Sequence, residues 1–232
     1  MRILIIGSAG GIGRTLIAGM GERHDLRLID VVPTPGRADA LVGDADDYDT
    51  VLEACAGVEA VIHLVHVGGG DAWDDAQKAM RSAYNMYEAC RVNRVRRVAF
   101  ASRAGVLPRS YYPRTIQRTA DMLPKPDSLY TITKVFGESL GYMYSARHGL
   151  EVVGVRIGNF KPDRDRPEDP HHLSHGDCVR LFEAAVTHPN VQFEVVFGVS
   201  DSDWPLYDLD HGRRAIGYFP QDRSSVPESE RQ

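Results

Sequence analysis

Short apolar runs alternate along the chain with longer stretches in which apolar residues recur at helical spacing. Residues 2–6 form an apolar, β-branched run, and residues 12–20 show the spacing of an amphipathic helix. The other predicted strands are 26–30, 40–42, 58–64, 97–101, 151–157 and 191–197, and the other predicted helices are 46–54, 72–92, 128–148, 175–187 and 208–216. This alternation predicts βαβ units, and therefore an α/β fold with a Rossmann-type, doubly wound parallel sheet.

Polar stretches outside these elements suggest how the chain is organised. No internal repeat and no glycine- and serine-rich linker interrupts the pattern, so we expect a single domain over residues 1–220. Two polar segments, 103–127 and 158–205, are predicted to form a small C-terminal cap on the substrate side of the sheet. The last residues, 221–232, are predicted to be a polar tail that frays.

Composition narrows the possible functions. The chain has 232 residues, 43% of them hydrophobic and 25% charged, with a formal net charge of -5. A mildly acidic chain without basic blocks is a poor candidate for binding nucleic acid. No run reaches the roughly 18 apolar residues that a membrane span needs, so no membrane association is expected. Glycines and Arg14 interrupt the N-terminal apolar run, so we predict no secretory signal and expect a cytoplasmic protein.

Cysteine and histidine spacing predicts no metal site. The three cysteines are widely spaced and form no CxxC pair, which argues against a disulfide framework and a zinc site. The cluster that most resembles a metal-binding set is His171, His172, His175 and Asp177. Adjacent histidines rarely point into one site, so a capped helix start with a histidine facing the substrate is the preferred interpretation.

A glycine pattern directly follows the first predicted strand. The loop contains Gly7, Gly10, Gly11, Ile12 and Gly13. Glycines at this spacing permit a tight turn, let backbone amides approach a pyrophosphate and allow the next helix to pack close to the sheet. Because the loop lies between a buried strand and a helix, it predicts a dinucleotide-binding site.

An acidic residue at the end of the second predicted strand indicates which dinucleotide is bound. The Asp30 carboxylate can accept hydrogen bonds from the ribose hydroxyls of NAD, and it would repel the 2′-phosphate of NADP. Val31 follows it where an arginine would favour NADP, so NAD is the expected cofactor. Asp44 and Ala45 follow the third predicted strand, and Asp44 either contacts the adenine amine or caps the next helix.

Tyr130 and Lys134 are one turn apart on the predicted helix 128–148, so their side chains share one face. A phenol with an ordinary pKa near 10 is a poor base at neutral pH. A neighbouring lysine favours the phenolate and lowers that pKa, so the pair is a candidate for proton transfer. The same lysine can hold the nicotinamide ribose.

Together these residues resemble the extended short-chain dehydrogenase/reductase superfamily, also called the NAD-dependent epimerase/dehydratase family. The resemblance spans nearly the whole chain and includes residues 98–102, 137–138 and 155–159. Within the superfamily the chain looks most like uronate dehydrogenases and the related archaeal sugar and sugar-phosphate dehydrogenases. The resemblance implies an NAD-binding Rossmann domain that oxidises the anomeric carbon of a sugar.

The resemblance also implies roles for individual residues. It makes Tyr130 the base that removes the hydroxyl proton and Lys134 the residue that positions the ribose, and Ser102 is the candidate for the catalytic hydroxyl. The further cofactor contacts that it implies are Leu64, Val65, His66, Ala101 and Ile157. The candidate substrate contacts are Arg103, Asn159 and Arg166, of which Arg103 and Asn159 stand where the family usually has serines.

The segment after the fifth predicted strand departs from the family pattern. Two adjacent hydroxyl residues are usual there, and the second completes the catalytic triad, whereas here Arg103 follows Ser102. Arg103 clamps a substrate carboxylate or phosphate, polarises a carbonyl, or points into solvent from a shifted loop. In the last case Ser102 or Ser110 supplies the hydroxyl. Ala104 and Gly105 also replace the Asn-His substrate motif of the uronate dehydrogenases.

We therefore expect an NAD-dependent oxidoreductase that transfers hydride between nicotinamide and a hydroxyl or carbonyl of a small polar substrate, a sugar or sugar acid. One alternative is an epimerase or dehydratase that retains its NAD. Another is an NAD-binding sensor with impaired catalysis, which the arginine at position 103 would explain. The long helices 72–92 and 128–148 are expected to pair with a second subunit in a homodimer.

Overall fold

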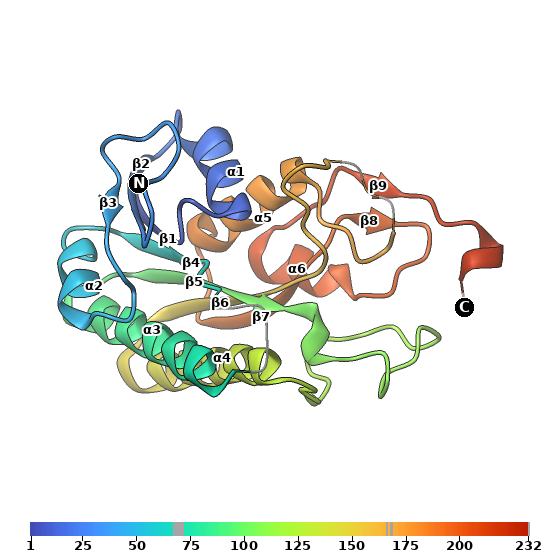
Figure 1. The fold of residues 1–232 in the computed structure, drawn as a ribbon. Coiled ribbons are helices and arrows are strands. Elements are labelled where there is room, and N and C mark those ends of the chain that lie inside the picture. The colour runs from blue at the N-terminus through green and yellow to red at the C-terminus, as the bar shows by residue number, and fades with distance from the viewer. Residues whose placement is uncertain (67–71, 166, 168, 232) are drawn as a thin grey trace.

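Seven parallel strands form the central sheet of the protein, whose computed structural model describes residues 1–66, 72–165, 167 and 169–231. They are β1 (Arg2–Ile6), β2 (Asp25–Asp30), β3 (Leu41–Val42), β4 (Ala60–His63), β5 (Arg97–Arg103), β6 (Glu151–Ile157) and β7 (Phe193–Gly198). Their order across the sheet is β3-β2-β1-β4-β5-β6-β7 (Figure 1). The chain thus winds outward from β1 in both directions, which confirms the predicted doubly wound Rossmann fold.

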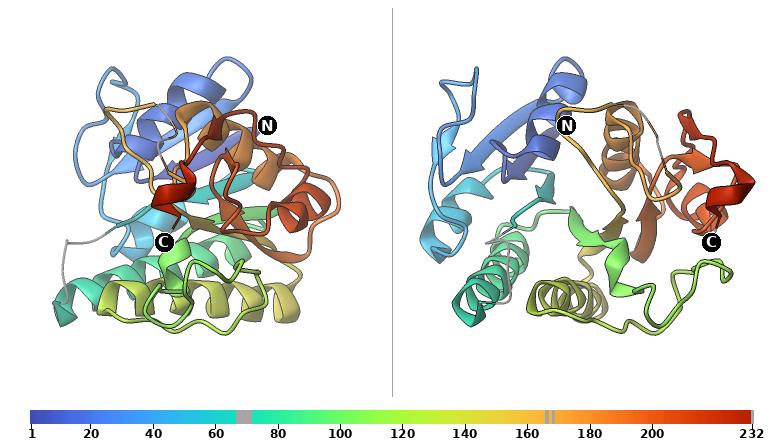
Figure 2. Two further views of the ribbon diagram at one scale, coloured as in Figure 1. Left: turned by 90° about the vertical axis from the view of Figure 1, so that its right-hand side faces the viewer. Right: turned by 45° about the vertical axis from the view of Figure 1, so that its right-hand side comes forward.

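Helices cover both faces of this sheet (Figure 2). They are α1 (Gly11–Met20), α2 (Tyr48–Ala54), α3 (Trp73–Val92), α4 (Leu129–His148), α5 (His175–Thr187) and α6 (Leu209–Ile216), with 3-10 turns at Ala104–Val106 and Glu228–Glu230. Apolar side chains of α1, α5 and α6 pack in one core layer, and those of α2, α3 and α4 pack in the other. The sheet is therefore buried on both sides, as all-parallel sheets are.

The first strand shows how the sequence pattern produces these two layers. Ile3 and Ile5 pack with the α1 and α5 layer, whereas Leu4 and Ile6 pack with the α3 layer. Successive side chains of a strand point to opposite faces, so an unbroken apolar run is needed where both faces are covered.

Local signals set the ends of the long helix α4, which carries the candidate catalytic pair. The Ser128 hydroxyl accepts a hydrogen bond of 3.2 Å from the Thr131 backbone N–H, which caps the N-terminus. Gly149 ends the helix with a left-handed backbone, φ 70°. Both boundaries agree with the predicted helix.

Two parts of the chain differ from the predicted organisation. Residues 158–205 are predicted to belong to the cap, but α5 packs against α1 and β7 pairs with β6, so both belong to the core. The predicted tail 221–232 is only partly free, since β9 (Arg223–Ser224) pairs with β8 (Asp201–Ser202) and Val226 is buried. This pairing supplies hydrogen-bond partners that the backbone of 201–203 otherwise lacks.

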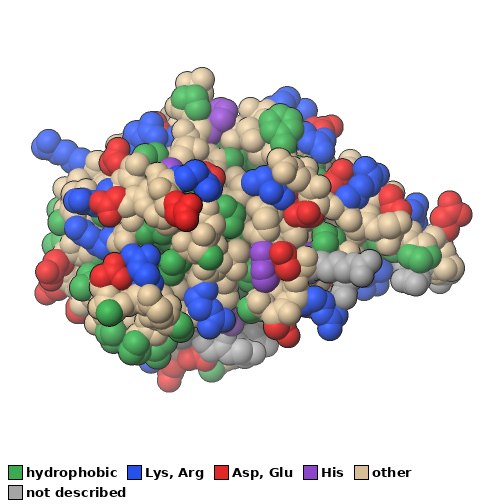
Figure 3. All heavy atoms as spheres, turned by 90° about the horizontal axis from the view of Figure 1, so that it is seen from above, with side chains coloured by type: hydrophobic (Ala, Val, Ile, Leu, Met, Phe, Trp, Pro, Cys, Tyr) green, Lys and Arg blue, Asp and Glu red, His purple; other side chains and the backbone are tan. Residues whose placement is uncertain are grey.

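The surface carries charges of both signs. On the face formed by α1 and α5, the described acidic and basic side chains are interspersed rather than gathered into a patch of one sign (Figure 3). Within the described ranges, no helix combines the length and the apolar character that crossing a membrane requires.

Candidate active site

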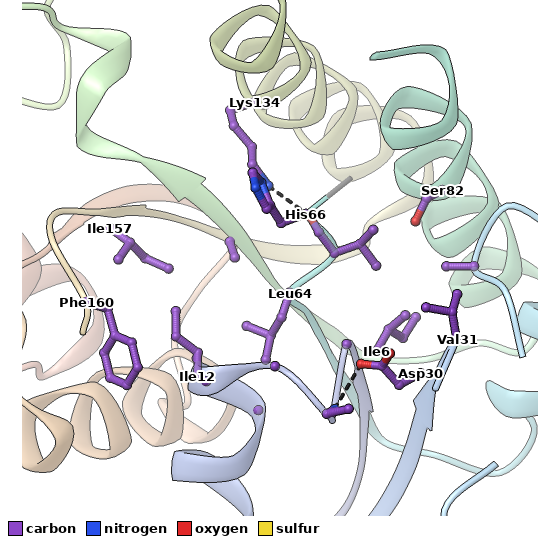
Figure 4. A pocket seen from close by; sticks show the side chains of 18 of the residues that line it. Ile6, Ile12, Asp30, Val31, Leu64, His66, Ser82, Lys134, Ile157 and Phe160 are labelled. Carbon is purple, nitrogen blue, oxygen red and sulfur yellow. Dashed lines mark hydrogen bonds between the residues drawn. The ribbon is translucent and has the colours of Figure 1, made fainter. Parts of the chain in front are cut away.

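A cavity of about 870 Å³ opens where the strand order reverses, between the carboxyl ends of β1 and β4 (Figure 4). Open parallel sheets bind their ligands at this switch point, because the loops that follow the neighbouring strands diverge there. The glycine loop and Asp30 line the cavity near β1 and β2, and Tyr130 and Lys134 line it from α4. The volume is in the usual range for a cofactor site.

The glycine loop lies at the bottom of the cavity, between β1 and α1. Gly7 has φ 94°, a backbone conformation that an L side chain rarely adopts. Its backbone N–H donates to the Ile29 carbonyl at 2.9 Å, which ties the turn to β2. The N-terminus of α1 therefore faces the cavity and can receive the phosphates of a dinucleotide.

The Asp30 carboxylate is bound to the same loop. Its Oδ2 accepts a hydrogen bond of 2.9 Å from the Ala9 backbone N–H, and its Oδ1 accepts one of 3.3 Å from the Val32 backbone N–H (Figure 4). Asp30 and Val31 also line the cavity, as the sequence predicts for residues beside the adenosine ribose. One carboxylate thus orders the phosphate loop and faces the ribose position.

The segment after β3 completes this end of the cavity. Asp44 and Ala45 line it, and Asp44 accepts a hydrogen bond from the Asp46 backbone rather than capping α2. The cap of α2 is Asp47, whose carboxylate accepts from the Asp49 backbone, so the capping alternative for Asp44 is wrong. Asn85 of α3 donates to the Ala45 carbonyl at 3.1 Å and fixes the turn.

Tyr130 and Lys134 extend from the first turns of α4 toward the end of β4. The Lys134 ammonium donates to the Val65 carbonyl at 3.1 Å and lies 5.5 Å from the centroid of the Tyr130 ring. The His66 ring meets the Tyr130 ring edge-on, with 4.7 Å between centroids. The expected pair is therefore on the cavity, and Figure 4 shows Lys134 and His66 beside one another.

Burial dominates the electrostatics of the pair. It raises the pKa of the Tyr130 phenol, and the charge of Arg103 opposes that rise. Burial also lowers the pKa of Lys134 to about 8, and the charge of Arg103 lowers it further. The pKa of Tyr130 is thus raised rather than lowered as the sequence predicts, because desolvation outweighs the charge of Arg103, the cation that favours the phenolate here.

Ser102 lies on the cavity wall, but its hydroxyl is already engaged. It donates to Glu138 Oε1 at 2.5 Å, and Arg156 binds both oxygens of the same carboxylate at 3.0 Å and 2.9 Å. All three side chains are buried. Glu138 is one turn beyond Lys134 on α4, so helical spacing could have indicated its proximity to the pair.

The three residues expected to bind substrate are placed differently. Arg103 ends β5 and lines the cavity beside Tyr130. Asn159 is not among the described lining residues, because its backbone is paired with the strand-like segment 171–173. Arg166 lies outside the described residues. Ser110, the alternative source of a hydroxyl, is exposed and does not line the cavity.

The cavity also contains residues that the sequence analysis missed. Phe160 and Pro162 come from the loop after β6, and a Cβ at Gly11 would lie 2.5 Å from Pro162, so this loop rests directly on the glycine loop. Lys78 and Ser82 line it from α3. The scarcity of lysines in the chain was a usable signal for Lys78, whereas nothing local marked Phe160 or Pro162.

The histidine cluster at the start of α5 serves the packing of that segment. His171 Nδ1 shares a hydrogen bond of 2.7 Å with the Tyr207 hydroxyl, and His175 Nε2 contacts the Lys161 carbonyl at 2.9 Å. The Asp177 carboxylate is bound by Arg180. Within the part of the chain that the structure describes, no group of three His, Cys, Asp or Glu side chains is arranged to hold a metal ion.

The glycine loop with Asp30 and the pair Tyr130–Lys134 thus face one cavity, so fold and site together define a dinucleotide-dependent oxidoreductase. A family model for the NAD-dependent epimerase/dehydratase family matches residues 3–191. The chain belongs to this family.

Individual relatives agree with that assignment. The chain is 33% identical to the NAD-dependent glucose-6-phosphate dehydrogenase of Haloferax volcanii, over 96% of this chain and 94% of that protein. It is 33% identical to the uronate dehydrogenase of Pseudomonas syringae pv. tomato, over 97% of this chain and 83% of that protein. The crystal structure of the uronate dehydrogenase from Agrobacterium tumefaciens matches at a TM-score of 0.87 and 31% identity, covering 96% of this chain and 85% of that one.

A variant of the Agrobacterium enzyme was solved in complex with NAD, and it matches at a TM-score of 0.88 and 30% identity, covering 96% of this chain and 85% of that one. These comparisons confirm the family, the Rossmann fold, the oxidoreductase class and NAD as the cofactor. The cavity fits that cofactor, since the start of α1 faces it at one end and Lys134 lines it at the other.

Proposed function

We propose that the protein oxidises a hydroxyl group of a sugar or sugar acid. The observation that carries this proposal is that Tyr130 and Lys134 line the same cavity as the glycine loop and Asp30. The Tyr130 side chain placed there can accept the proton of a substrate hydroxyl when it is ionised to the phenolate. NAD, when bound, supplies the acceptor for the hydride that leaves the same carbon.

Each part of the chain has a separate task in this reaction. The start of α1 binds the pyrophosphate, and Asp30 accepts hydrogen bonds from the adenosine ribose. Lys134, anchored on the Val65 carbonyl, holds the nicotinamide ribose beside Tyr130. Ile157 and Phe160 contribute apolar side chains to the lining of the cavity.

The relatives support the substrate class. They are named for glucose 6-phosphate, for L-arabinose and for uronates, so the class includes acidic and neutral sugars. Arg103 and His66 are the polar side chains at the substrate end of the cavity in this chain. A guanidinium there suits a substrate rich in oxygen atoms.

A second function is an NAD-binding protein with impaired catalysis. The observation that favours it is the Ser102 hydroxyl, which donates to Glu138 rather than into the cavity. An epimerase or dehydratase that retains NAD would show no net reduction of added cofactor.

Nicotinamide absorbance during incubation with NAD and a substrate panel separates these functions. The panel contains uronic acids, neutral sugars, sugar phosphates and simple alcohols, and Tyr130→Phe is assayed in parallel. NAD reduction with one class, abolished in the variant, supports the dehydrogenase. Tight NAD binding without reduction by any class supports the sensor. Interconversion of sugars without net reduction supports the epimerase.

We also propose a homodimer that pairs α3 and α4 with the same helices of a second copy. Tyr84 of α3 and Ile132 and Tyr142 of α4 are large apolar side chains that remain exposed in one chain. Sedimentation should give the mass of two chains, and Tyr142→Asp should reduce it to one. A wild-type protein that sediments as a single chain contradicts the dimer.

The cytoplasmic location expected from the sequence stays a prediction.

A further inference from the structure

Ser102 lines the cavity, but its hydroxyl is not free to donate a hydrogen bond to a substrate beside Tyr130. The Ser102 proton is given to Glu138, and Arg156 binds that carboxylate through two hydrogen bonds. Redirecting the Ser102 hydroxyl into the cavity would break a hydrogen bond to a buried carboxylate and leave Glu138 Oε1 with the Arg156 donor alone, and the loss of a hydrogen bond to a buried charged group is costly. Another group must therefore stabilise the oxygen that loses its proton to Tyr130.

The next residue, Arg103, lies where its guanidinium can stabilise that substrate oxygen. The carbon of its guanidinium lies 5.2 Å from the centroid of the Tyr130 ring, over the ring face. The side chain folds back against Gly105, where a Cβ would overlap the guanidinium and lie 2.9 Å from its central carbon. Gly105 thus leaves the space that this conformation of Arg103 requires.

The surroundings leave the Arg103 charge available. Among the described residues, no carboxylate is within ion-pair distance of its guanidinium. The titratable groups that face Tyr130 are Arg103 itself, His66 from the loop after β4, and Lys134 from its own helix. Arg103 is the group in this set whose positive charge persists at every pH at which the protein is folded.

We propose that Arg103 is a catalytic residue, whose guanidinium donates a hydrogen bond to the reacting oxygen of the substrate and whose charge stabilises the Tyr130 phenolate. This inference rests on the proposed dehydrogenase function. The substrate C–H bond breaks as hydride leaves to the oxidised nicotinamide, and the O–H proton passes to the Tyr130 phenolate. The carbon becomes a carbonyl carbon, and Arg103 binds its oxygen as negative charge develops on it.

Arg103→Gln tests the proposal in the full-length protein. Loss of a donor to a developing negative charge costs roughly a hundredfold in kcat, so we expect that loss at neutral pH with little change in KM. The acidic limb of the kcat profile should move to higher pH, because Tyr130 then ionises at higher pH. Raising the pH should restore part of the activity.

Gly105→Ala provides a second variant that keeps the arginine. The new methyl group displaces the Arg103 guanidinium from its position over the Tyr130 ring. We therefore expect kcat to fall and the acidic limb of the kcat profile to move to higher pH, as in Arg103→Gln. Arg103→Lys retains the charge without the forked donors and should fall between Arg103→Gln and the wild type. Arg147→Gln, at the exposed end of α4, is the matched control and should leave kcat unchanged.

A readout without cofactor or substrate separates this inference from the proposed function. Near-ultraviolet absorbance follows tyrosinate formation, and subtracting the Tyr130→Phe curve isolates Tyr130. Arg103→Gln should move this ionisation to higher pH even if no substrate of the panel is oxidised. An unchanged Tyr130 titration overturns the proposal, and so does a raised KM with unchanged kcat, which would make Arg103 only a clamp for a distant substrate anion.

Discussion

The Ser102 hydroxyl donates a hydrogen bond of 2.5 Å to the Glu138 carboxylate, directly beneath the candidate catalytic pair. Arg156 donates to both oxygens of that carboxylate, so one buried network joins β5, α4 and β6. The network holds α4 against the sheet at the level of Tyr130 and Lys134. Its members thus support the site without needing to contact the substrate.

Ser102→Ala should therefore reduce stability more than catalysis. Removing a hydrogen bond to a buried charged group costs about 1.5–3 kcal/mol of unfolding free energy. We expect that loss in urea denaturation, with kcat within a fewfold of the wild type. A large loss of kcat at unchanged stability would instead make the Ser102 hydroxyl catalytic.

Tyr130→Phe should abolish turnover while NAD binding persists. General base catalysis contributes about 10²–10⁴ in rate, so the residual kcat should be lower by that factor. Calorimetric titration with NAD should give a dissociation constant close to that of the wild type. Tyr111→Phe, at an exposed tyrosine that does not line the cavity, is the control. Retained turnover in Tyr130→Phe would show that another group takes the proton.

Asp30→Ala should weaken NAD binding about tenfold or more and reduce the discrimination against NADP. The carboxylate accepts hydrogen bonds from the glycine loop and lies at the predicted ribose position, so both the loop and the ribose contact are lost. The measurement is the ratio of the two dissociation constants. Asp25→Ala, at the opposite end of β2, is the control. An unchanged ratio would contradict the role of Asp30 in cofactor choice.

His63 should make the protein sensitive to acid. Burial, together with the nearby Lys134 charge, lowers the pKa of its imidazole from 6.5 to about 3. The unfolded chain binds a proton at this residue below pH 6.5 and the folded chain does not, so the stability that His63 contributes is complete above that pH. It is lost on acidification toward pH 3, at up to about 1.4 kcal/mol per pH unit.

The test compares the pH dependence of unfolding free energy in wild type and His63→Asn. The variant should lose stability less steeply between pH 6.5 and 4, even if its stability at neutral pH is lower because the contact with Ser82 changes. His148→Asn, on the exposed end of α4, should follow the wild-type curve. Parallel wild-type and His63→Asn curves would contradict a neutral, buried His63.

Much of the fold could be predicted because its signals are local. The unbroken apolar run of β1, the cap at Ser128 and the αL glycine at 149 each depend on neighbouring residues, and the structure keeps them within a residue or two. The glycine loop and the spacing of Tyr130 and Lys134 are local as well. The carboxyl ends of parallel strands lie on one edge of a sheet. These local signals were therefore enough to predict that the glycine loop and the pair Tyr130–Lys134 face the same site.

The local patterns of the sequence were therefore enough to predict the Rossmann fold, NAD as the cofactor, and the place of Tyr130 and Lys134 on the same cavity as the glycine loop. Three features follow only from the packing of the folded chain: Ser102 binds Glu138, Arg103 lies over the Tyr130 ring, and Phe160 lines the cavity. These contacts join residues far apart in the chain, so the spacing of residues within one helix or strand cannot predict them. The direction of the Tyr130 pKa shift was also decided there, because desolvation depends on everything that packs around the phenol.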